Sequence, residues 1–164
     1  MQLTQDYLKS ILDYVPETGT FTWKIKHFYK CHVGSTAGGI NGCGYIQIKI
    51  NNKCYKAHRL AFFYVYGIWP ENDIDHINGV RNDNRLENLR EATRIQNCQN
   101  RKRCQVNNAS SGLLGVSYSK NKNKYASQIM LNKKQNHLGY FSTPEEAHDA
   151  YLKAKRQIHE FGTL

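Results

Sequence analysis

The sequence predicts an α+β protein built from small antiparallel sheets and a few short helices. Segments with alternating polar and apolar residues are short, and Asn- and Gly-rich turns separate them. Apolar residues recur at helical spacing in only a few places. We expect an N-terminal helix and β-hairpin region at 1–56, a core of two strands and a helix at 57–101, a linker at 102–112, and a three-stranded antiparallel sheet packed on one helix at 113–164.

Charge favours a polyanionic partner. The chain has 23 basic and 13 acidic residues, a net charge of +10, and 11 tyrosines. Residues 99–164 alone hold 11 basic and 4 acidic residues, which is most of the excess. Lys and Arg neutralise phosphates, and aromatic rings pack on bases or sugars, so the composition suits a polyanion such as a nucleic acid. A solvated basic surface is the alternative.

Cysteine and apolar patterns argue against several other classes of protein. The five cysteines form no C-x-x-C pair, so a zinc ribbon is not expected, although Cys31, His32 and Cys43 could be imagined as ligands. An odd cysteine count fits reduced thiols. The longest apolar run, residues 60–66, is far too short to span a membrane, and the first residues do not resemble a signal peptide. We expect a cytoplasmic protein with no membrane contact and no obligate protein partner.

The N-terminal region is expected to hold one amphipathic helix and three strands. Helical spacing of apolar residues predicts a helix at residues 4–14, with Thr4 as its cap. Strands follow at residues 20–24, 44–50 and 53–56, the last two joined by an Asn-Asn turn. The basic face of that hairpin could lie along DNA or could be an ordinary half-exposed sheet face.

A nearly continuous apolar run, residues 58–66, predicts a buried helix that ends at Gly67. His58 begins this run. It could be a second catalytic histidine, but a histidine at the start of an apolar helix is more often hydrogen-bonded structure.

Four polar residues between positions 75 and 97 have the types and spacing of a one-metal phosphodiesterase site: Asp75, His76, Asn88 and Asn97. A carboxylate and an amide oxygen suit a hard divalent cation, and a neutral imidazole can take a proton from water. Because neighbouring residues of a regular strand face opposite ways, the strand must end or bend at the first two. Turn and cap roles are the alternative.

A second strand is expected at residues 89–92, followed by a helix. Several arginines flank the site, and some could hold phosphates, although each one is more readily explained as solvated: Arg81, Arg85, Arg90 and Arg94.

This segment resembles the HNH endonuclease family, in particular its phage and intron homing enzymes. The resemblance depends on the four residues above, on residues 82–90 (NDNRLENLR), and on His58-Arg59-Leu60. It implies two strands and a helix around one metal ion. His76 would be the general base, Asp75 and Asn97 the metal ligands, and Asn88 the residue that positions His76. His58 would lie outside the metal site. Asparagine at the last position favours Mg²⁺ or Mn²⁺ over zinc.

The last fifty residues predict strands at 113–118, 124–131 and 136–141, then a helix. Thr143 caps this helix, Pro144 takes its first position, and Glu146 completes a capping box. An apolar stripe along the helix faces the sheet. The stripe consists of Ala147, Ala150, Tyr151, Ala154 and Ile158.

Residues 110–162 resemble the APETALA/ethylene-response-factor DNA-binding domain. The resemblance depends on four short motifs: Gly115-Val116, Tyr125-Ala126 with Ile129, Leu138-Gly139-Tyr140-Phe141, and Thr143-Pro144-Glu145-Glu146-Ala147. It implies a sheet face that enters the major groove. The matching positions are Leu114, Ser117, Ser119, Gln128, Met130, Gln135 and His137. Plant members place mainly Arg and Trp there, so their base preference does not carry over.

These positions leave three candidate base readers, Gln128, Gln135 and His137, and five candidate phosphate partners, Lys120, Lys122, Lys124, Lys133 and Lys134. Arg101 and Arg103, before the linker, could follow the phosphate backbone. A solvated sheet face is the alternative.

Together these features predict a metal-dependent DNA endonuclease of homing type, from a phage or mobile element and active in a bacterial host cell. One motif supplies one active centre, so a monomer would nick one strand. The rival interpretations are a catalytically inactive DNA-binding regulator on a nuclease scaffold, and a nuclease directed at RNA.

Overall fold

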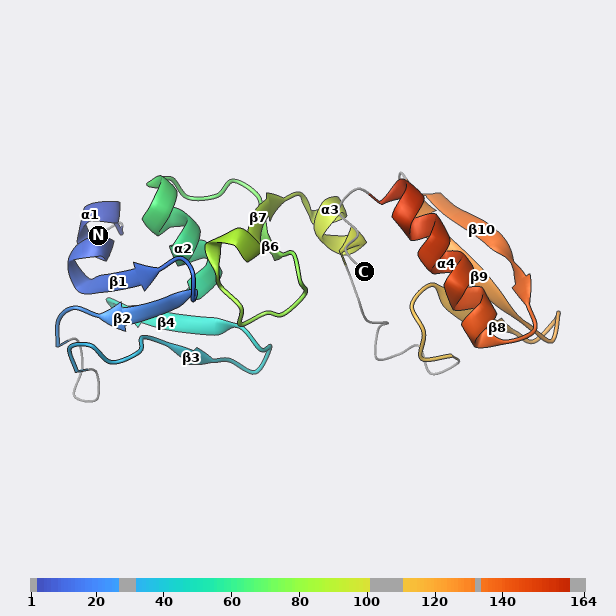
Figure 1. Cartoon of the computed structure of the whole chain (residues 1–164), viewed down its shortest axis with the longest axis horizontal. Coiled ribbons are helices and arrows are strands. Elements are labelled where there is room, and N and C mark those ends of the chain that lie inside the picture. The colour runs from blue at the N-terminus through green and yellow to red at the C-terminus, as the bar shows by residue number, and fades with distance from the viewer. Residues whose placement is uncertain (1–2, 27–31, 101–110, 132–133, 160–164) are drawn as a thin grey trace. The chain divides into compact units, whose positions relative to one another are not determined.

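The chain is an α+β protein that divides into two compact units, residues 1–94 and 95–164. A computed structural model describes residues 3–26, 32–100, 111–131 and 134–159 (Figure 1). No helix in these described ranges has both the length and the apolar character of a membrane-spanning helix.

The first unit begins with a short helix and a β-hairpin. Helix α1 (Gln5–Ile11) starts at Thr4, whose side chain accepts a hydrogen bond from the Tyr7 amide, as predicted. The predicted helix is wrong beyond Ile11, because β1 (Leu12–Val15) pairs antiparallel with β2 (Thr20–Trp23). Burial alternates along β1, with every second residue facing the core. This period of two coincided with helical spacing at Leu12 and obscured the change.

A three-stranded sheet follows, in the order β3-β4-β5. Its strands are β3 (Gly39–Ile40), β4 (Ile46–Ile50) and β5 (Lys53–Lys56). Asn51 and Asn52, with φ of 48° and 63°, make the predicted turn between β4 and β5. Such left-handed pairs match the twist of hairpin strands.

The remaining elements of this unit carry the candidate site. Helix α2 (Ala57–Tyr66) ends at Gly67 in a left-handed conformation, as predicted. Strand β6 (Asp73–His76) pairs antiparallel with β7 (Leu89–Ala92), and a 3-10 turn at Leu86–Asn88 lies between them in sequence. One hydrophobic cluster extends from Leu3 to Leu89. The predicted N-terminal region therefore shares a core with α2 and the β6–β7 pair.

The second unit contains α3 and a three-stranded antiparallel sheet covered on one face by a helix (Figure 1). Helix α3 (Arg94–Gln99) is the helix expected after β7. The sheet has the order β10-β9-β8, and its elements are β8 (Val116–Ser119), β9 (Lys124–Leu131), β10 (Lys134–Phe141) and α4 (Pro144–Ile158).

Local signals fixed most of this second sheet and its helix. Thr143 and Glu146 form the predicted capping box at the start of α4. Strand β8 begins three residues later than predicted, because Gly115 has φ of 77° and belongs to a turn. Any side chain at Gly115 would collide with the ring of Tyr151, so this glycine lets α4 pack against the sheet.

Candidate active site

The candidate site begins where strand β6 ends. Asp75 and His76, its last two residues, are both buried although they are neighbours in sequence. The chain turns immediately afterwards: the Gly79 amide donates to the His76 carbonyl at 2.9 Å, and the Ile77 amide donates to the Asn88 carbonyl at 2.9 Å. The strand ends at the pair where the chemistry requires it to end.

Asp75 pairs with an arginine on the neighbouring strand. It stands opposite Arg90 in the β6–β7 register, and its Oδ2 accepts bonds from Arg90 Nε at 3.2 Å and Nη2 at 3.0 Å. The carboxylate is buried and the guanidinium is partly exposed. This contact fixes a hard oxygen donor beside His76.

The His76 ring is fixed by a buried asparagine. Its Nε2 lies 3.3 Å from Asn84 Oδ1, and both side chains are buried. A carbonyl oxygen only accepts hydrogen bonds, so Nε2 carries the proton and Nδ1 has the lone pair. Burial lowers the pKa of His76, against the opposing effects of the Asn84 bond and the Asp75 charge. The imidazole is therefore a neutral base near pH 7.

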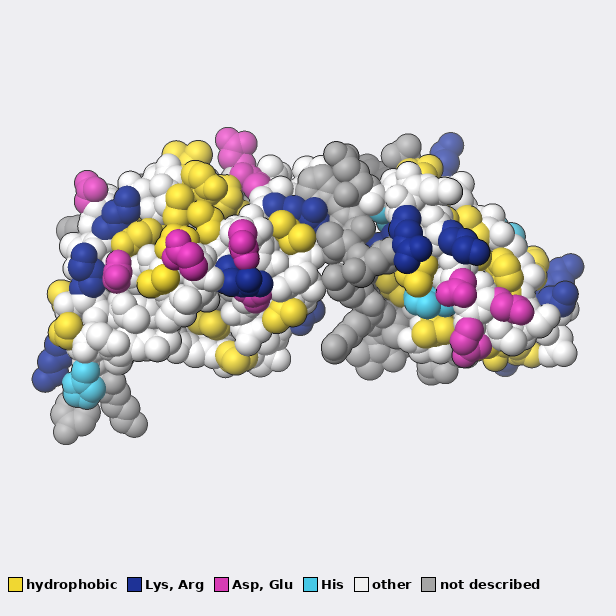
Figure 2. Space-filling model, viewed as in Figure 1, with side chains coloured by type: hydrophobic (Ala, Val, Ile, Leu, Met, Phe, Trp, Pro, Cys, Tyr) yellow, Lys and Arg dark blue, Asp and Glu magenta, His cyan; other side chains and the backbone are white. Residues whose placement is uncertain are grey.

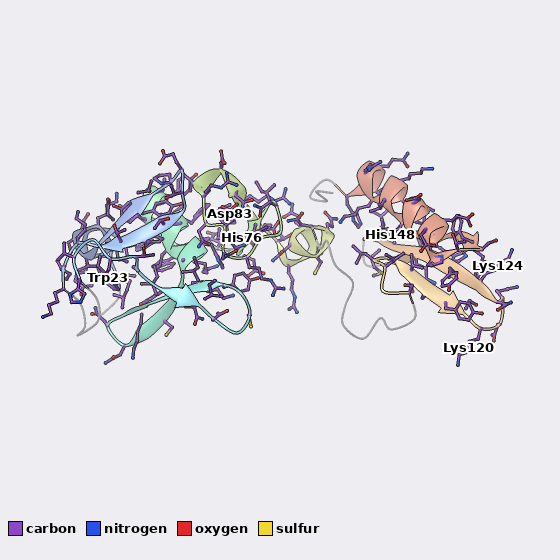
Figure 3. All side chains as sticks on the ribbon, turned by 60° about the horizontal axis from the view of Figure 1, so that its bottom comes forward. Trp23, His76, Asp83, Lys120, Lys124 and His148 are labelled. Carbon is purple, nitrogen blue, oxygen red and sulfur yellow. The ribbon has the colours of Figure 1, made fainter. Side chains whose placement is uncertain are left out.

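Asn88 holds the loop between the two strands. Its Oδ1 accepts from the Asn78 amide at 2.9 Å, and its Nδ2 donates to the Asp83 carbonyl at 2.8 Å. Hydrogen bonds from the Arg85 side chain are the main reason that the pKa of Asp83 falls to about 2. His76 and Asp83 are labelled in this part of the first unit in Figure 3. Asn88 is thus a brace for the loop that contains Asn84.

Asn84 was absent from the predicted site. Its position in the sequence does not distinguish it from Asn82, two residues earlier in the same polar loop. Its burial, with 1% of its surface exposed, comes from residues far away in sequence. The only advance signal was its place in a loop rich in side chains that bond locally.

The β1–β2 hairpin supports this loop from the other side. The Tyr14 hydroxyl donates to the Asn84 carbonyl at 2.8 Å, and the Leu86 amide donates to the Pro16 carbonyl at 2.9 Å. A side chain at Gly19 would collide with the Asn84–Arg85 backbone. The backbone of the loop therefore lies directly against the hairpin turn.

Two rings and two basic groups complete the surroundings of His76. The His58 and His76 ring centroids are 4.9 Å apart in an edge-on arrangement, and Tyr45 lies 5.2 Å from His58 and 5.9 Å from His76. Lys56 Nζ and Arg81 Cζ lie 4.8 and 5.3 Å from the centre of the Tyr45 ring.

His58 is buried as expected of a structural histidine, but the predicted hydrogen bonding fails at one nitrogen. The side chain is buried, and its Nδ1 has no hydrogen-bond partner among the described residues. Burial, and next the electrostatic effect of protonating His76 beside it, lower its pKa to about 3. It packs against His76 as an uncharged ring.

Asn97 lies in α3, half-buried, beyond the boundary at Arg94 that ends the first unit. Its pairing with Asp75 stays a prediction. No cluster of three or more His, Cys, Asp or Glu side chains able to hold a metal occurs in the described ranges. A site made of one carboxylate, one amide oxygen and waters would not contain such a cluster. Arg101 and Arg103 lie outside the described residues.

Comparison with protein families identifies this region. Residues 55–99 match the family model described as HNH endonuclease. The chain carries an HNH endonuclease domain. The match contains β6, β7 and α3, and with them Asp75, His76, Asn88 and Asn97. HNH nucleases generally use a divalent metal ion.

One solved structure is similar to the chain: that of the HNH homing endonuclease I-HmuI, which describes DNA binding and cleavage by that enzyme. Sequence identity is 27%, with a TM-score of 0.42. The match covers 55% of this chain and 51% of the other, so this chain spans about half of that protein's length. No curated protein matches the sequence.

The candidate DNA-binding residues of the second unit lie on the exposed face of its sheet, at the β8–β9 turn and at the start of β10. Register and burial put Gln128, Gln135 and His137 on the sheet face away from α4. The Gln135 side chain donates to Gln128. Exposed lysines lie on or beside the β8–β9 turn and at the start of β10: Lys120, Lys122, Lys124 and Lys134 (Figure 3 labels Lys120 and Lys124). Lys133 lies outside the described residues.

Acidic residues of this unit gather elsewhere. Within its described ranges they are Glu145, Glu146 and Asp149, all in the first half of α4. Figure 2 shows acidic side chains over the helix face. The first half of α4 is therefore a less suitable surface for a phosphate backbone than the sheet face.

Proposed function

We propose that this protein is a metal-dependent DNA endonuclease of homing type, which hydrolyses a phosphodiester bond of double-stranded DNA and nicks one strand per active centre. The observation that carries this proposal is the buried, neutral His76 beside the Asp75 carboxylate at the end of β6, inside an HNH endonuclease domain.

His76 is the general base in this proposal. With Nε2–H donating to Asn84, Nδ1 is the atom that takes a proton from the attacking water. Burial keeps the imidazole uncharged near pH 7, which suits a base. Asn88 acts through the loop by keeping Asn84 in place.

Asp75 and Asn97 are the proposed ligands of one divalent ion, Mg²⁺ or Mn²⁺. Their oxygen donors suit those hard cations, which retain several waters. When bound, the ion would polarise the scissile phosphate and stabilise the leaving oxygen. Arg90 holds Asp75 in position through two hydrogen bonds to Oδ2.

The second unit is proposed to bind the duplex, in the manner of the APETALA/ethylene-response-factor domain. Gln128, Gln135 and His137 would face base edges, while the lysines of the β8–β9 turn would contact phosphates. The concentration of acidic groups on α4 supports use of the opposite face. Arg101, Arg103 and Lys133 are proposed as further phosphate contacts.

A plasmid-nicking assay tests the enzymatic proposal. Supercoiled plasmid is incubated with the protein in Mg²⁺, in Mn²⁺ and in EDTA, and duplex binding is measured in parallel. Wild type should produce open circles only with metal. His76→Ala should abolish nicking and retain binding, while His32→Ala, at an exposed histidine of the same unit, should retain both.

Two outcomes would favour the rival functions. Wild type that binds duplex DNA but never nicks it with either metal would be a regulator on a nuclease scaffold. The second outcome concerns competition for duplex DNA. If RNA displaces the wild-type protein at the same concentration as competitor DNA, or at a lower one, the protein is directed at RNA. Nicking by His76→Ala at the wild-type rate would remove this histidine from the mechanism.

A further inference from the structure

Two basic side chains are held on one tyrosine ring beside His76. Lys56, at the end of β5, and Arg81, in the loop after β6, both approach Tyr45. That ring also contacts the rings of His58 and His76. With two imidazoles and two cations around it, Tyr45 is a platform that fixes positive charge by cation–π attraction.

Arg81 is fixed further by a structured loop. Its Nη1 donates to the Cys43 carbonyl at 2.8 Å. That carbonyl is itself held, because Asn41 Oδ1 accepts from the amides of Cys43 at 2.9 Å and Tyr45 at 3.0 Å. A guanidinium has five N–H donors, so one bond orients it without exhausting it.

Charge pairing separates Arg81 from the arginines that follow it in the loop and in β7. Arg85 forms ion pairs with Asp83 and Glu87, and Arg90 pairs with Asp75. Across the described ranges, no ion pair involves Lys56 or Arg81, and both side chains are exposed. Two oriented cations without a carboxylate partner form a site for an anion.

The position of this site relative to His76 identifies the anion. The Tyr45 centroid is 5.9 Å from that of His76, and the cations are 4.8 and 5.3 Å from the Tyr45 centroid, so neither charge is more than about 11 Å from the His76 ring. This distance is at most roughly three nucleotides, at about 3.4 Å of rise each along the duplex axis. We propose that Lys56 and Arg81 bind a phosphate of the DNA strand within three nucleotides of the cleaved bond. This inference rests on the proposed endonuclease function.

Salt dependence of binding tests the site. Affinity of the full chain for a 30-base-pair duplex is measured in EDTA over a range of salt, for wild type, Lys56→Gln and Arg81→Gln. Each variant should reduce the slope of log K against log salt by about 1. Arg81→Lys should retain the wild-type slope, because it keeps the charge. In nicking assays the Gln variants should raise KM and leave kcat near wild type.

Lys9 provides the matched control. Its Nζ lies 5.4 Å from the centre of the Tyr64 ring, so Lys9→Gln also removes a cation stacked on a tyrosine of the same unit. It should leave the slope unchanged. Equal slopes for Lys9→Gln and Arg81→Gln would overturn the site, as would a fall in kcat with unchanged affinity.

Outcomes for this site and for the enzyme can be told apart. If wild type nicks DNA but the Lys56 and Arg81 variants behave like Lys9→Gln, the phosphate site is wrong and the endonuclease proposal stands. If wild type never nicks but those two variants weaken binding as expected, the endonuclease proposal is wrong, and Lys56 and Arg81 still bind a DNA phosphate. Wild type that fails to bind duplex DNA would overturn both.

Discussion

Acid should destabilise the first unit through His58, and the size of the effect follows from its burial. The folded state holds this imidazole uncharged, with a pKa of about 3, whereas an unfolded chain protonates it below about pH 6.5. Above pH 6.5 neither state binds the proton and the stability is unaffected. As the pH falls from 6.5 towards 3, only the unfolded state gains it, so the free energy of unfolding decreases by about 1.4 kcal/mol per pH unit.

Between pH 7 and pH 5 this linkage amounts to about 2 kcal/mol. His58→Phe keeps an aromatic ring against Tyr45 and His76 but cannot titrate. It also removes the buried Nδ1 that has no partner in the described ranges. We therefore expect the variant to lose about 2 kcal/mol less stability than wild type over the same pH interval.

Urea unfolding followed by tryptophan fluorescence measures this difference. Both tryptophans of the chain, Trp23 and Trp69, lie in the first unit, so the signal reports that unit alone. His32→Phe, at an exposed position of the same unit, should retain the wild-type pH dependence. Parallel loss of stability in wild type and His58→Phe would refute the reasoning, because it would mean that the buried histidine does not resist protonation.

Three further predictions concern the loop and the second unit. Asn84→Ala removes the acceptor that orients His76, and should reduce kcat about 10- to 100-fold in nicking assays while duplex affinity stays the same; an unchanged kcat would exclude the orienting role. Gly19→Ala should cost more than the ~1–2 kcal/mol of a left-handed alanine, because its side chain meets the loop backbone. Gly34 has a similar φ of 81° but open space around it, so Gly34→Ala should cost only the ~1–2 kcal/mol of the left-handed backbone. Equal losses of unfolding free energy in urea for the two variants would show that a side chain at position 19 does not meet the loop. The last change replaces three lysines by glutamine: Lys120, Lys122 and Lys124. It should reduce the slope of log K against log salt for duplex binding by about 2 to 3, and an unchanged slope would count against the second unit as a DNA-binding module.

Elements with strong local signals could be predicted from the sequence. The β4–β5 hairpin was fixed by two adjacent asparagines, and α4 by a threonine cap with proline and glutamate after it. The ends of β7 and β9 agree with the prediction residue for residue. In each case the determining residues lie within a few positions of the feature they determine.

Contacts between distant residues could not be predicted in this way. Strand β1 exists because Leu12–Val15 finds a partner in Thr20–Trp23, and its apolar residues also fitted a helix. Asn84 becomes a site residue because Tyr14, seventy positions earlier, binds its carbonyl. The proximity of Tyr45 to His76 likewise depends on packing of the sheet against α2, which no spacing in the sequence encodes.

The neighbours of His76 explain why this part of the fold is retained at a cost to stability. Asn84 Nδ2 and His58 Nδ1 are buried nitrogens without hydrogen-bond partners in the described ranges, and each such group costs roughly 1–3 kcal/mol. Apolar side chains at both positions would avoid that cost, but a leucine at 84 would leave Nε2 of His76 without its acceptor. An imidazole that must keep one tautomer, and remain uncharged while buried, needs an amide on one side and a neutral ring on the other. Two of the buried nitrogens without partners in the described ranges therefore lie on the residues that hold the His76 ring.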